Sequence, residues 1–302
     1  MHISTPLVPS RSLEVHVGVP VHLKLENLQP SGSFKLRGIA RLAANAFAAG
    51  ARSFVSSSGG NAGLAAAYVA RRLGAPATVV VPASTDPRIR ALIQDEGAKV
   101  ITHGTAWAEA DVLARQIGER EGATYVPPFD HPDIWAGIST MIEELPADME
   151  PPGAVVLSVG GGGLLAGVLD GLRARGWNTT FVVAVETEGA ASFAGAQRAG
   201  HPVTLPRIDT IARNLGAPRI ADGAFERAAR WDVRSVLVDD RAALSACRRF
   251  LDDHRMLVEP ACGATLAAIY DHTPALATAV SVLAIVCGGA CITARDLYAV
   301  DG

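Results

Sequence analysis

The sequence contains few lysines and no excess of charge of one sign. Of its 27 basic residues only Lys24, Lys35 and Lys99 are lysines, and 30 acidic residues bring the formal net charge to -3. This composition lacks the basic surface that binds nucleic acids or anionic membranes, so we expect neither as a partner. Because arginine supplies almost all of the positive charge, each lysine position calls for its own explanation.

Long apolar stretches are also missing. The longest, such as residues 279–286, fall far short of the about 20 residues that a membrane-spanning helix needs. The N-terminal segment has no basic stretch followed by an apolar one, as a secretory signal would have. We therefore expect a cytoplasmic protein that acts on a small molecule.

Cysteine motifs are absent, although the chain has 4 cysteines. None belongs to a CxxC pair or has a histidine at metal-ligand spacing. We expect all of them to be reduced thiols, at Cys247, Cys262, Cys287 and Cys291.

What the chain does contain is an alternation of short apolar runs and alanine-rich segments of helical length. Its 302 residues, 49% of them hydrophobic, predict about two packed domains. The alternation is typical of parallel sheets with crossover helices, so we expect an α/β fold of two doubly wound parallel-sheet domains. Residues 143–153, rich in Pro and Glu, predict a connection between units. The predicted strands are residues 21–25, 53–56, 78–81, 99–102, 155–159, 180–186, 235–238 and 282–286.

Four consecutive glycines, Gly160, Gly161, Gly162 and Gly163, separate a predicted strand from the helix that follows it. Glycines at such a position let several backbone N–H groups face an anion at the positive end of a helix dipole. A tight turn alone would need fewer glycines. We therefore predict a phosphate-binding loop here.

The same segment leaves a second interpretation open. Gly161, Gly163 and Ala166 satisfy the GxGxxA form of the dinucleotide fingerprint, and Glu186 ends the next predicted strand, where a ribose-binding acid is expected. A nicotinamide-dependent oxidoreductase is therefore an alternative. It leaves two further segments without a role.

The first of these segments, PSGSFKLRG, places Lys35 between a flexible turn and an alanine-rich helix. The helix dipole disfavours a charged amine at a helix start, which lowers its pKa and makes it a better nucleophile. The alternative is a solvated lysine, the usual fate of this side chain. Phe34, directly before it, is either a core residue or a residue that packs against a planar ring.

The second segment, SSSGGNAG at residues 56–63, also lies between a predicted strand and a helix. Its hydroxyls, glycine N–H groups and Asn61 form a set of donors suited to a carboxylate or a ring oxygen. A helix cap would need only one such side chain.

In this order, the three segments resemble the pyridoxal-phosphate enzymes of the tryptophan-synthase-β type, and most closely the L-serine/L-threonine dehydratases. Similar blocks run through nearly the whole chain, among them LKLENLQPSGSFKLRG, SSSGGNAGLAAAYVARRLGAPATVVVP, SVGGGGLLAGV, AVETEGAASF, VEPACGATLAA and IVCGGACIT. The resemblance implies an L-serine and L-threonine ammonia-lyase that yields pyruvate or 2-oxobutanoate and ammonia. It also implies a homodimer with pyridoxal 5'-phosphate in the cleft between a large domain, residues 1–34 and 140–302, and a small domain, residues 35–139.

The resemblance also assigns residues. Lys35 becomes the catalytic lysine that holds the cofactor covalently, and Cys287 lies opposite the pyridine nitrogen. The cofactor-binding set is Phe34, Lys35, Asn61, Gly160, Gly161, Gly162, Gly163, Leu164 and Cys287. The substrate carboxylate is expected at Ser58, Gly59 and Asn61. A monovalent cation such as K+ is expected at Glu186, Ala190, Ser192, Leu215 and Ala217.

Two departures from the family pattern leave the substrate open. Asn214 stands where a small residue is usual, and Gly59 is expected to leave the carboxylate side less crowded. A serine racemase and a β-replacement synthase are therefore alternatives within the same cofactor class. A binding protein without catalysis is a further alternative, but it would not need Lys35, Asn61 and Cys287 together.

Overall fold

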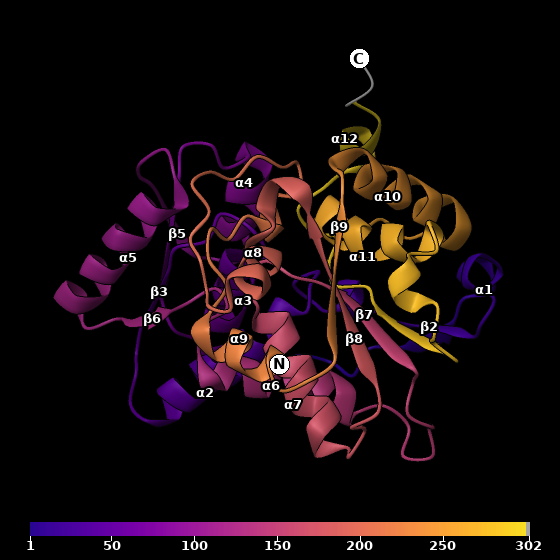
Figure 1. Ribbon diagram of the computed structural model, residues 1–302. Helices are drawn as coiled ribbons and strands as arrows, with labels where there is room; N and C mark the ends of the chain where they lie inside the picture. The colour runs from indigo at the N-terminus through magenta and orange to yellow at the C-terminus, as the bar shows by residue number, and fades with distance from the viewer. Residues whose placement is uncertain (300–302) are drawn as a thin grey trace.

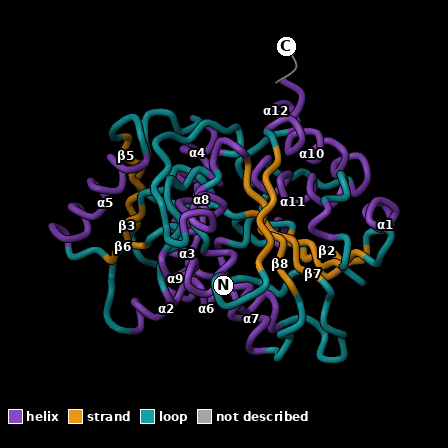
Figure 2. Tube along the Cα trace, in the orientation of Figure 1, coloured by secondary structure: helices purple, strands orange, loops and turns teal. Residues whose placement is uncertain are grey.

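The strands form two separate sheets. The computed structural model describes residues 1–299, and Figures 1 and 2 show the strands as two groups with helices around and between them. The strands are β1 (Leu7–Pro9), β2 (Val21–Lys24), β3 (Phe54–Ser56), β4 (Ala77–Val81), β5 (Lys99–Thr102), β6 (Thr124–Val126), β7 (Ala154–Ser158), β8 (Phe181–Thr187), β9 (Val233–Val238) and β10 (Val282–Ile285).

The larger sheet has the order β1-β2-β10-β7-β8-β9, and the smaller one has the order β5-β4-β3-β6. All pairs in the smaller sheet are parallel. The larger sheet is mixed, because β1 pairs with β2 antiparallel. The expectation of wholly parallel sheets is wrong at this edge: the connection that carries α1 is too short for the crossover that parallel neighbours need.

The helices fill the space around both sheets. The α-helices are α1 (Arg11–Val17), α2 (Lys35–Ala48), α3 (Asn61–Leu73), α4 (Pro87–Asp95), α5 (Trp107–Glu121), α6 (Pro132–Glu143), α7 (Gly163–Ala174), α8 (Ser192–Ala199), α9 (Asp222–Ala228), α10 (Asp240–His254), α11 (Pro260–Tyr270) and α12 (Ala294–Ala299). Four short 3-10 helices are η1 (Glu26–Leu28), η2 (Glu188–Ala190), η3 (Arg213–Leu215) and η4 (Pro274–Leu276).

Both faces of the larger sheet are covered. Helix α11 packs on β7 and β8 and is buried at every position after Pro260, as expected for a helix that is apolar on nearly all sides. Figure 1 shows α10 and α11 on one side of this sheet and α7 on the other. Every residue of β8 is buried, which is typical of a strand covered on both faces.

The strand order reverses once in each sheet. In the larger sheet the chain runs from β7 outward to β9 on one side, while β10 lies on the other side of β7. In the smaller sheet β3 leads outward to β5, and β6 lies on the other side of β3. Ligands bind at the carboxyl ends of the strands that flank such reversals. The two sheets therefore indicate where a site is expected: after β7 and β10, and after β3 and β6.

The local predictions agree well with this fold. All eight predicted strands are present, with ends that differ by one or two residues, and α2, α3 and α7 begin at Lys35, Asn61 and Gly163. Strands β1 and β6 were not predicted. The cysteines are free thiols. Within residues 1–299 no helix is long and apolar enough to cross a membrane.

Candidate active site

One pocket lies at the carboxyl ends of the strands that flank the reversal of strand order in each sheet. Phe34 and Lys35 precede and begin α2, Asn61 begins α3, and Cys287 follows β10. The pocket is lined by Phe34, Lys35, Asn61, Phe129, Ser158, Val159, Gly160, Gly161, Gly162, Gly163, Leu164, Asn214, Leu215, Glu259, Ala261 and Cys287. The structure thus brings together every residue of the predicted cofactor-binding set, although these residues come from both sheets.

The Lys35 amine lies among groups that do not neutralise it. Its Nζ donates a hydrogen bond of 2.7 Å to the carbonyl of Pro128 and lies 5.2 Å and 5.7 Å from the ring centroids of Phe34 and Phe129. Burial lowers the pKa of Lys35 to about 8. At pH 7 about a tenth of this amine is therefore unprotonated and able to act as a nucleophile or base, far more than for an unburied lysine.

The lowered pKa predicts how Lys35 reacts in the protein freed of any ligand. Because only the neutral amine attacks an acylating or arylating reagent, labelling of Lys35 is expected to rise with pH through a midpoint near 8. Quantitative peptide mapping across pH 6 to 11 measures this midpoint. A midpoint near that of an unburied lysine, about 10.4, would contradict the burial of the amine.

The glycine loop offers unpaired donors. Among the residues that the structure describes, the backbone N–H groups of Gly160, Gly161 and Gly162 donate to no protein acceptor. They lie immediately before α7, where the helix dipole favours an anion. Packing also demands these glycines: a Cβ on Gly161 would lie 2.4 Å from the ring of Phe129, and one on Gly160 would lie 2.9 Å from the Cα of Leu215.

A buried carboxyl group holds Asn61. Glu259, which is 2% exposed, accepts hydrogen bonds of 2.7 Å from Asn61 Nδ2 and 3.0 Å from Asn214 Nδ2. Burial raises the pKa of Glu259, with the two amides and Lys35 acting against it. The Oδ1 of Asn61 accepts from the thiol of Cys291 at 3.3 Å. Asn214 therefore lines the pocket and is also a hydrogen-bond partner of the buried carboxyl group.

Cys287 faces the pocket from the end of β10. Its Sγ lies 3.6 Å from the hydroxyl of Ser158, at the end of β7. A hydrogen bond with Cys262 and burial raise the pKa of the Cys287 thiol well above its usual value. The group is therefore a neutral thiol at physiological pH, suited to a weak hydrogen bond with a ring nitrogen and unable to form an ion pair with it.

Ser58 and Gly59 do not line this pocket. They lie in the loop between β3 and α3, where Ser58 Oγ accepts from the N–H of Gly60 at 3.3 Å. A Cβ on Gly59 would lie 2.2 Å from Thr85 Oγ1. The expectation of a less crowded carboxylate side is therefore wrong, because Thr85 fills the space that the glycine leaves.

Glu186 lies behind the glycine loop and is fully buried. Its carboxylate oxygens accept from the N–H groups of Phe193 and Ala194 at 2.7 Å and 2.8 Å. Both oxygens are thus used inside the protein, and Glu186 is not available to a ribose as the dinucleotide interpretation requires. Burial raises the pKa of Glu186 to about 7.

The other residues of the predicted cation site lie on segments next to Glu186. The hydroxyl of buried Ser192 has no hydrogen-bond partner, and Ala190 ends η2 just before it. Leu215 and Ala217 belong to the loop that packs against Gly160, and the N–H of Ala217 donates to the carbonyl of Leu215 at 2.8 Å. No group of three or more His, Cys, Asp and Glu side chains within residues 1–299 is placed to hold a metal ion.

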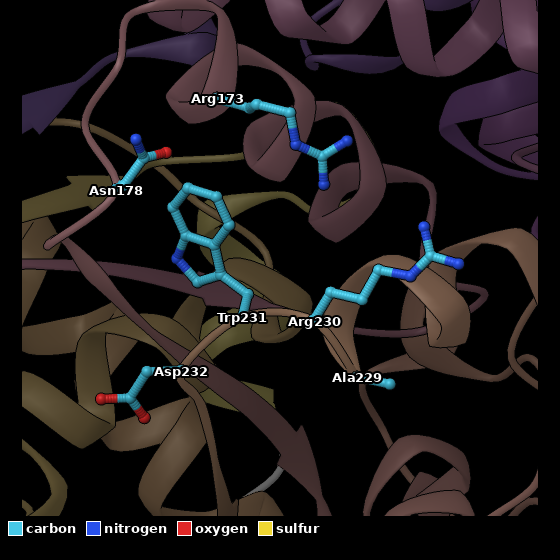
Figure 3. A pocket seen from close by; sticks show the side chains of 6 residues that line it. All are labelled: Arg173, Asn178, Ala229, Arg230, Trp231 and Asp232. Carbon is cyan, nitrogen blue, oxygen red and sulfur yellow. The ribbon is translucent and has the colours of Figure 1, made fainter.

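A larger hollow lies elsewhere on the surface. It has a volume of about 690 Å³, and Figure 3 shows the side chains of Arg173 and Arg230 extending on the same side of the Trp231 ring. It contains none of the predicted site residues and lies at no carboxyl end of a strand that flanks a reversal. Its lining residues are Arg173, Asn178, Ala229, Arg230, Trp231 and Asp232. Chemistry, and not volume, therefore identifies the active site.

Comparison with known proteins agrees with this geometry. Residues 1–288 match the family described as "Pyridoxal-phosphate dependent enzyme". The chain belongs to this family. Pyridoxal phosphate is accordingly its cofactor. The chain is 49% identical to human "Serine dehydratase-like" over 310 residues, which cover 99% of this chain and 93% of the relative. It is 43% identical to human "L-serine dehydratase/L-threonine deaminase", with 99% and 94% coverage.

A solved structure of the family is similar over its whole length. It is an L-serine ammonia-lyase from the fungus Rhizomucor miehei, with a TM-score of 0.92, 38% identity, and coverage of 98% of this chain and 96% of that one. The residues of the pocket fit pyridoxal phosphate: unpaired N–H groups suit its phosphate, a lysine with a pKa near 8 suits its aldehyde, and a neutral thiol suits its ring nitrogen.

Several site residues escaped the sequence analysis. Glu259 was not predicted as a site residue, and its signal in the sequence is a carboxylate directly before the proline that begins a largely apolar helix. Phe129 and Pro128 follow β6, a strand of three residues with too little pattern to predict. Ser158 was considered only as part of a strand. Each of these residues contacts a predicted site residue from a distant part of the chain.

Proposed function

We propose that this protein is an ammonia-lyase that converts L-serine and L-threonine to pyruvate and 2-oxobutanoate, with release of ammonia. The observation that carries the proposal is the likeness to the Rhizomucor L-serine ammonia-lyase over nearly the whole of both chains. The curated relatives named serine dehydratase and threonine deaminase support it. The reaction removes the α-proton and the β-hydroxyl of the amino acid, and hydrolysis of the dehydrated product liberates ammonia.

Lys35 is the catalytic residue of this proposal. When bound, the cofactor supplies an electron sink that makes the α-proton of an amino acid acidic. Lys35 would hold the cofactor covalently until the amino group of the substrate displaces it, and its freed Nζ would then take the α-proton. The lowered pKa supports this role, because an amine with a pKa near the working pH accepts and releases a proton with little cost.

The remaining residues bind and orient. The unpaired N–H groups of the glycine loop hold the phosphate, and Leu164 follows them in the first turn of α7. Phe34 packs against the ring, Asn61 donates to the ring hydroxyl, and Cys287 meets the ring nitrogen as a neutral partner. A neutral partner would leave the ring nitrogen unprotonated, so the cofactor would supply a weaker electron sink. A weaker sink favours loss of the β-hydroxyl of the amino acid over return of the proton to its α-carbon.

The loop of Ser58, Gly59 and Asn61 binds the substrate carboxylate in this proposal. Its position directly before α3 supports the assignment, because a helix start favours an anion. A monovalent cation such as K+ binds behind the glycine loop, beside Glu186 and Ser192. The hydroxyl of Ser192 is buried without a hydrogen-bond partner, and a bound cation would give its oxygen one, which supports this assignment.

Assembly and location complete the proposal. The protein acts as a homodimer in the cytoplasm. Residues 1–34 and 140–302 form its large domain and residues 35–139 its small domain. The strands support this division, because β3, β4, β5 and β6 lie within residues 35–139 and the strands of the larger sheet lie outside them.

The test is a panel of amino acids assayed for release of keto acid by the purified holoenzyme. We expect L-serine to yield pyruvate and L-threonine to yield 2-oxobutanoate, with an equal amount of ammonia, and D-serine to serve as the control. Chiral analysis of the remaining serine measures racemisation in the same samples. Absence of keto acid from both L-amino acids, or D-serine formed faster than pyruvate, would overturn the proposal.

A further inference from the structure

A polar cluster that runs from buried Ser57 to exposed Arg115 lies behind the loop that precedes α3. It consists of four side chains, Ser57, Asp111, Arg115 and Tyr125, which come from the end of β3, from α5 and from β6. None of them lines the active-site pocket. The proposed function gives the cluster no role.

Asp111 is the centre of this cluster. Its Oδ1 accepts a hydrogen bond of 2.6 Å from Ser57 Oγ and a further one from Tyr125 Oη, and its Oδ2 accepts from Arg115 Nε at 2.8 Å. The guanidinium of Arg115 also lies 4.1 Å from the ring centroid of Tyr125. Burial opposes ionisation of Asp111, but the three donors outweigh it and lower the pKa of the carboxyl group. Asp111 is therefore a carboxylate at neutral pH with every oxygen engaged.

Ser57 connects this carboxylate to the loop. It is fully buried and directly precedes Ser58. The loop behind it has little freedom, because a Cβ on Gly63 would lie 1.8 Å from the carbonyl oxygen of Ser58. The first turn of α3 thus packs directly on the loop, and a shift of Ser57 is transmitted to Ser58 and to the start of α3 at Asn61.

We propose that Asp111 is a positioning residue for the substrate: by holding Ser57, it fixes the loop of residues 58–61 in the orientation that receives the amino-acid carboxylate. This inference rests on the proposed function, which places the substrate carboxylate at that loop. Asp111 and Ser57 act through the loop and touch neither substrate nor cofactor. Loss of either is expected to weaken substrate binding while leaving the cofactor and Lys35 in place.

The variants Ser57→Ala and Asp111→Asn test this role in the holoenzyme. Each is expected to raise KM for L-serine about tenfold, with kcat within about twofold of the wild type, because lost binding shared by ground and transition state appears in KM alone. The visible spectrum of the bound cofactor is expected to stay unchanged. The double variant is expected to show no more than the larger single effect, because both substitutions break the same connection.

The chain supplies a matched control. Asp170 on α7 also accepts from an arginine, Arg227 Nε at 2.9 Å, whose guanidinium lies 4.5 Å from the ring centroid of Trp135. This pair repeats the Asp-Arg-aromatic arrangement, but none of its members borders the loop of residues 58–61. Asp170→Asn is expected to lower the thermal midpoint without a change in KM.

The outcomes separate this inference from the proposed function. A wild-type enzyme without keto-acid release from serine would reject the proposed function itself. With an active wild type, the positioning role would be overturned by an unchanged KM in Ser57→Ala and Asp111→Asn. It would also be overturned if these variants lost only thermal stability, by as much as Asp170→Asn does. Multiplicative effects on KM in the double variant would also overturn it, because they would mean that the two residues act independently.

Discussion

Replacing Lys35 with alanine is expected to lower kcat for L-serine about 1000-fold or more while leaving cofactor in the pocket. The variant loses the only amine among the described residues that line the site, and a positioned base alone contributes about 100- to 10000-fold in rate. The N–H groups of Gly160, Gly161 and Gly162 stay in place to hold the phosphate, so binding weakens without being abolished.

Keto-acid release and the cofactor content after gel filtration measure the two parts of this prediction. Lys99→Ala is the control, because Lys99 is an exposed residue of β5 and is not one of the lining residues. Borohydride reduction of the wild-type holoenzyme followed by peptide mapping is expected to label Lys35. A label on Lys24 or Lys99, or activity of Lys35→Ala within tenfold of the wild type, would contradict the assignment.

Replacing Arg37 with methionine is expected to destabilise the fold by about 3 to 5 kcal/mol, although this residue does not touch the site. Arg37 is fully buried two positions after Lys35. Its Nε and Nη2 donate to Glu26 at 2.7 Å and 2.8 Å, and its Nη1 donates to Glu144 at 3.0 Å. Lys24 also pairs with Glu144. The variant would leave Glu26, itself fully buried, without its cation.

The thermal midpoint of the holoenzyme measures this loss, which we expect to amount to about 5 to 15 °C. Arg41→Met on the same helix is the matched control, because Arg41 is exposed and makes a single long bond of 3.4 Å to the carbonyl of Ala136. The control is expected to change the midpoint by less than about 2 °C. An equal effect of both substitutions would mean that the buried ion network does not hold α2 in place.

This network also explains Lys24, the second of the unusual lysines. Lys24 forms an ion pair with Glu144 and donates a hydrogen bond of 2.7 Å to the carbonyl of Thr5. Nothing in the neighbourhood of Lys24 in the sequence indicates these partners. They come from the N-terminal segment and from the end of α6.

Elements whose cause is local could be predicted from the sequence. Glycines and hydroxyl residues between an apolar run and an alanine-rich run predicted where β3 ends and α3 begins, and the same reasoning located the start of α7. The isolated lysine in PSGSFKLRG predicted a site residue, and Lys35 lines the pocket. Such features depend on residues within one or two turns of one another, so one segment carries the whole signal.

Which of these segments meet, and what surrounds them, depends on packing between distant parts of the chain. Glu259 and Asn61 are 198 positions apart, Lys35 and Pro128 are 93 apart, and Ser57 and Asp111 are 54 apart. Their pairing follows from the strand order of two sheets, which brings the ends of β3, β6, β7 and β10 together. Burial then shifts the pKa values of Lys35 and Glu259, and burial is a property of the packed interior that no short segment of the chain contains.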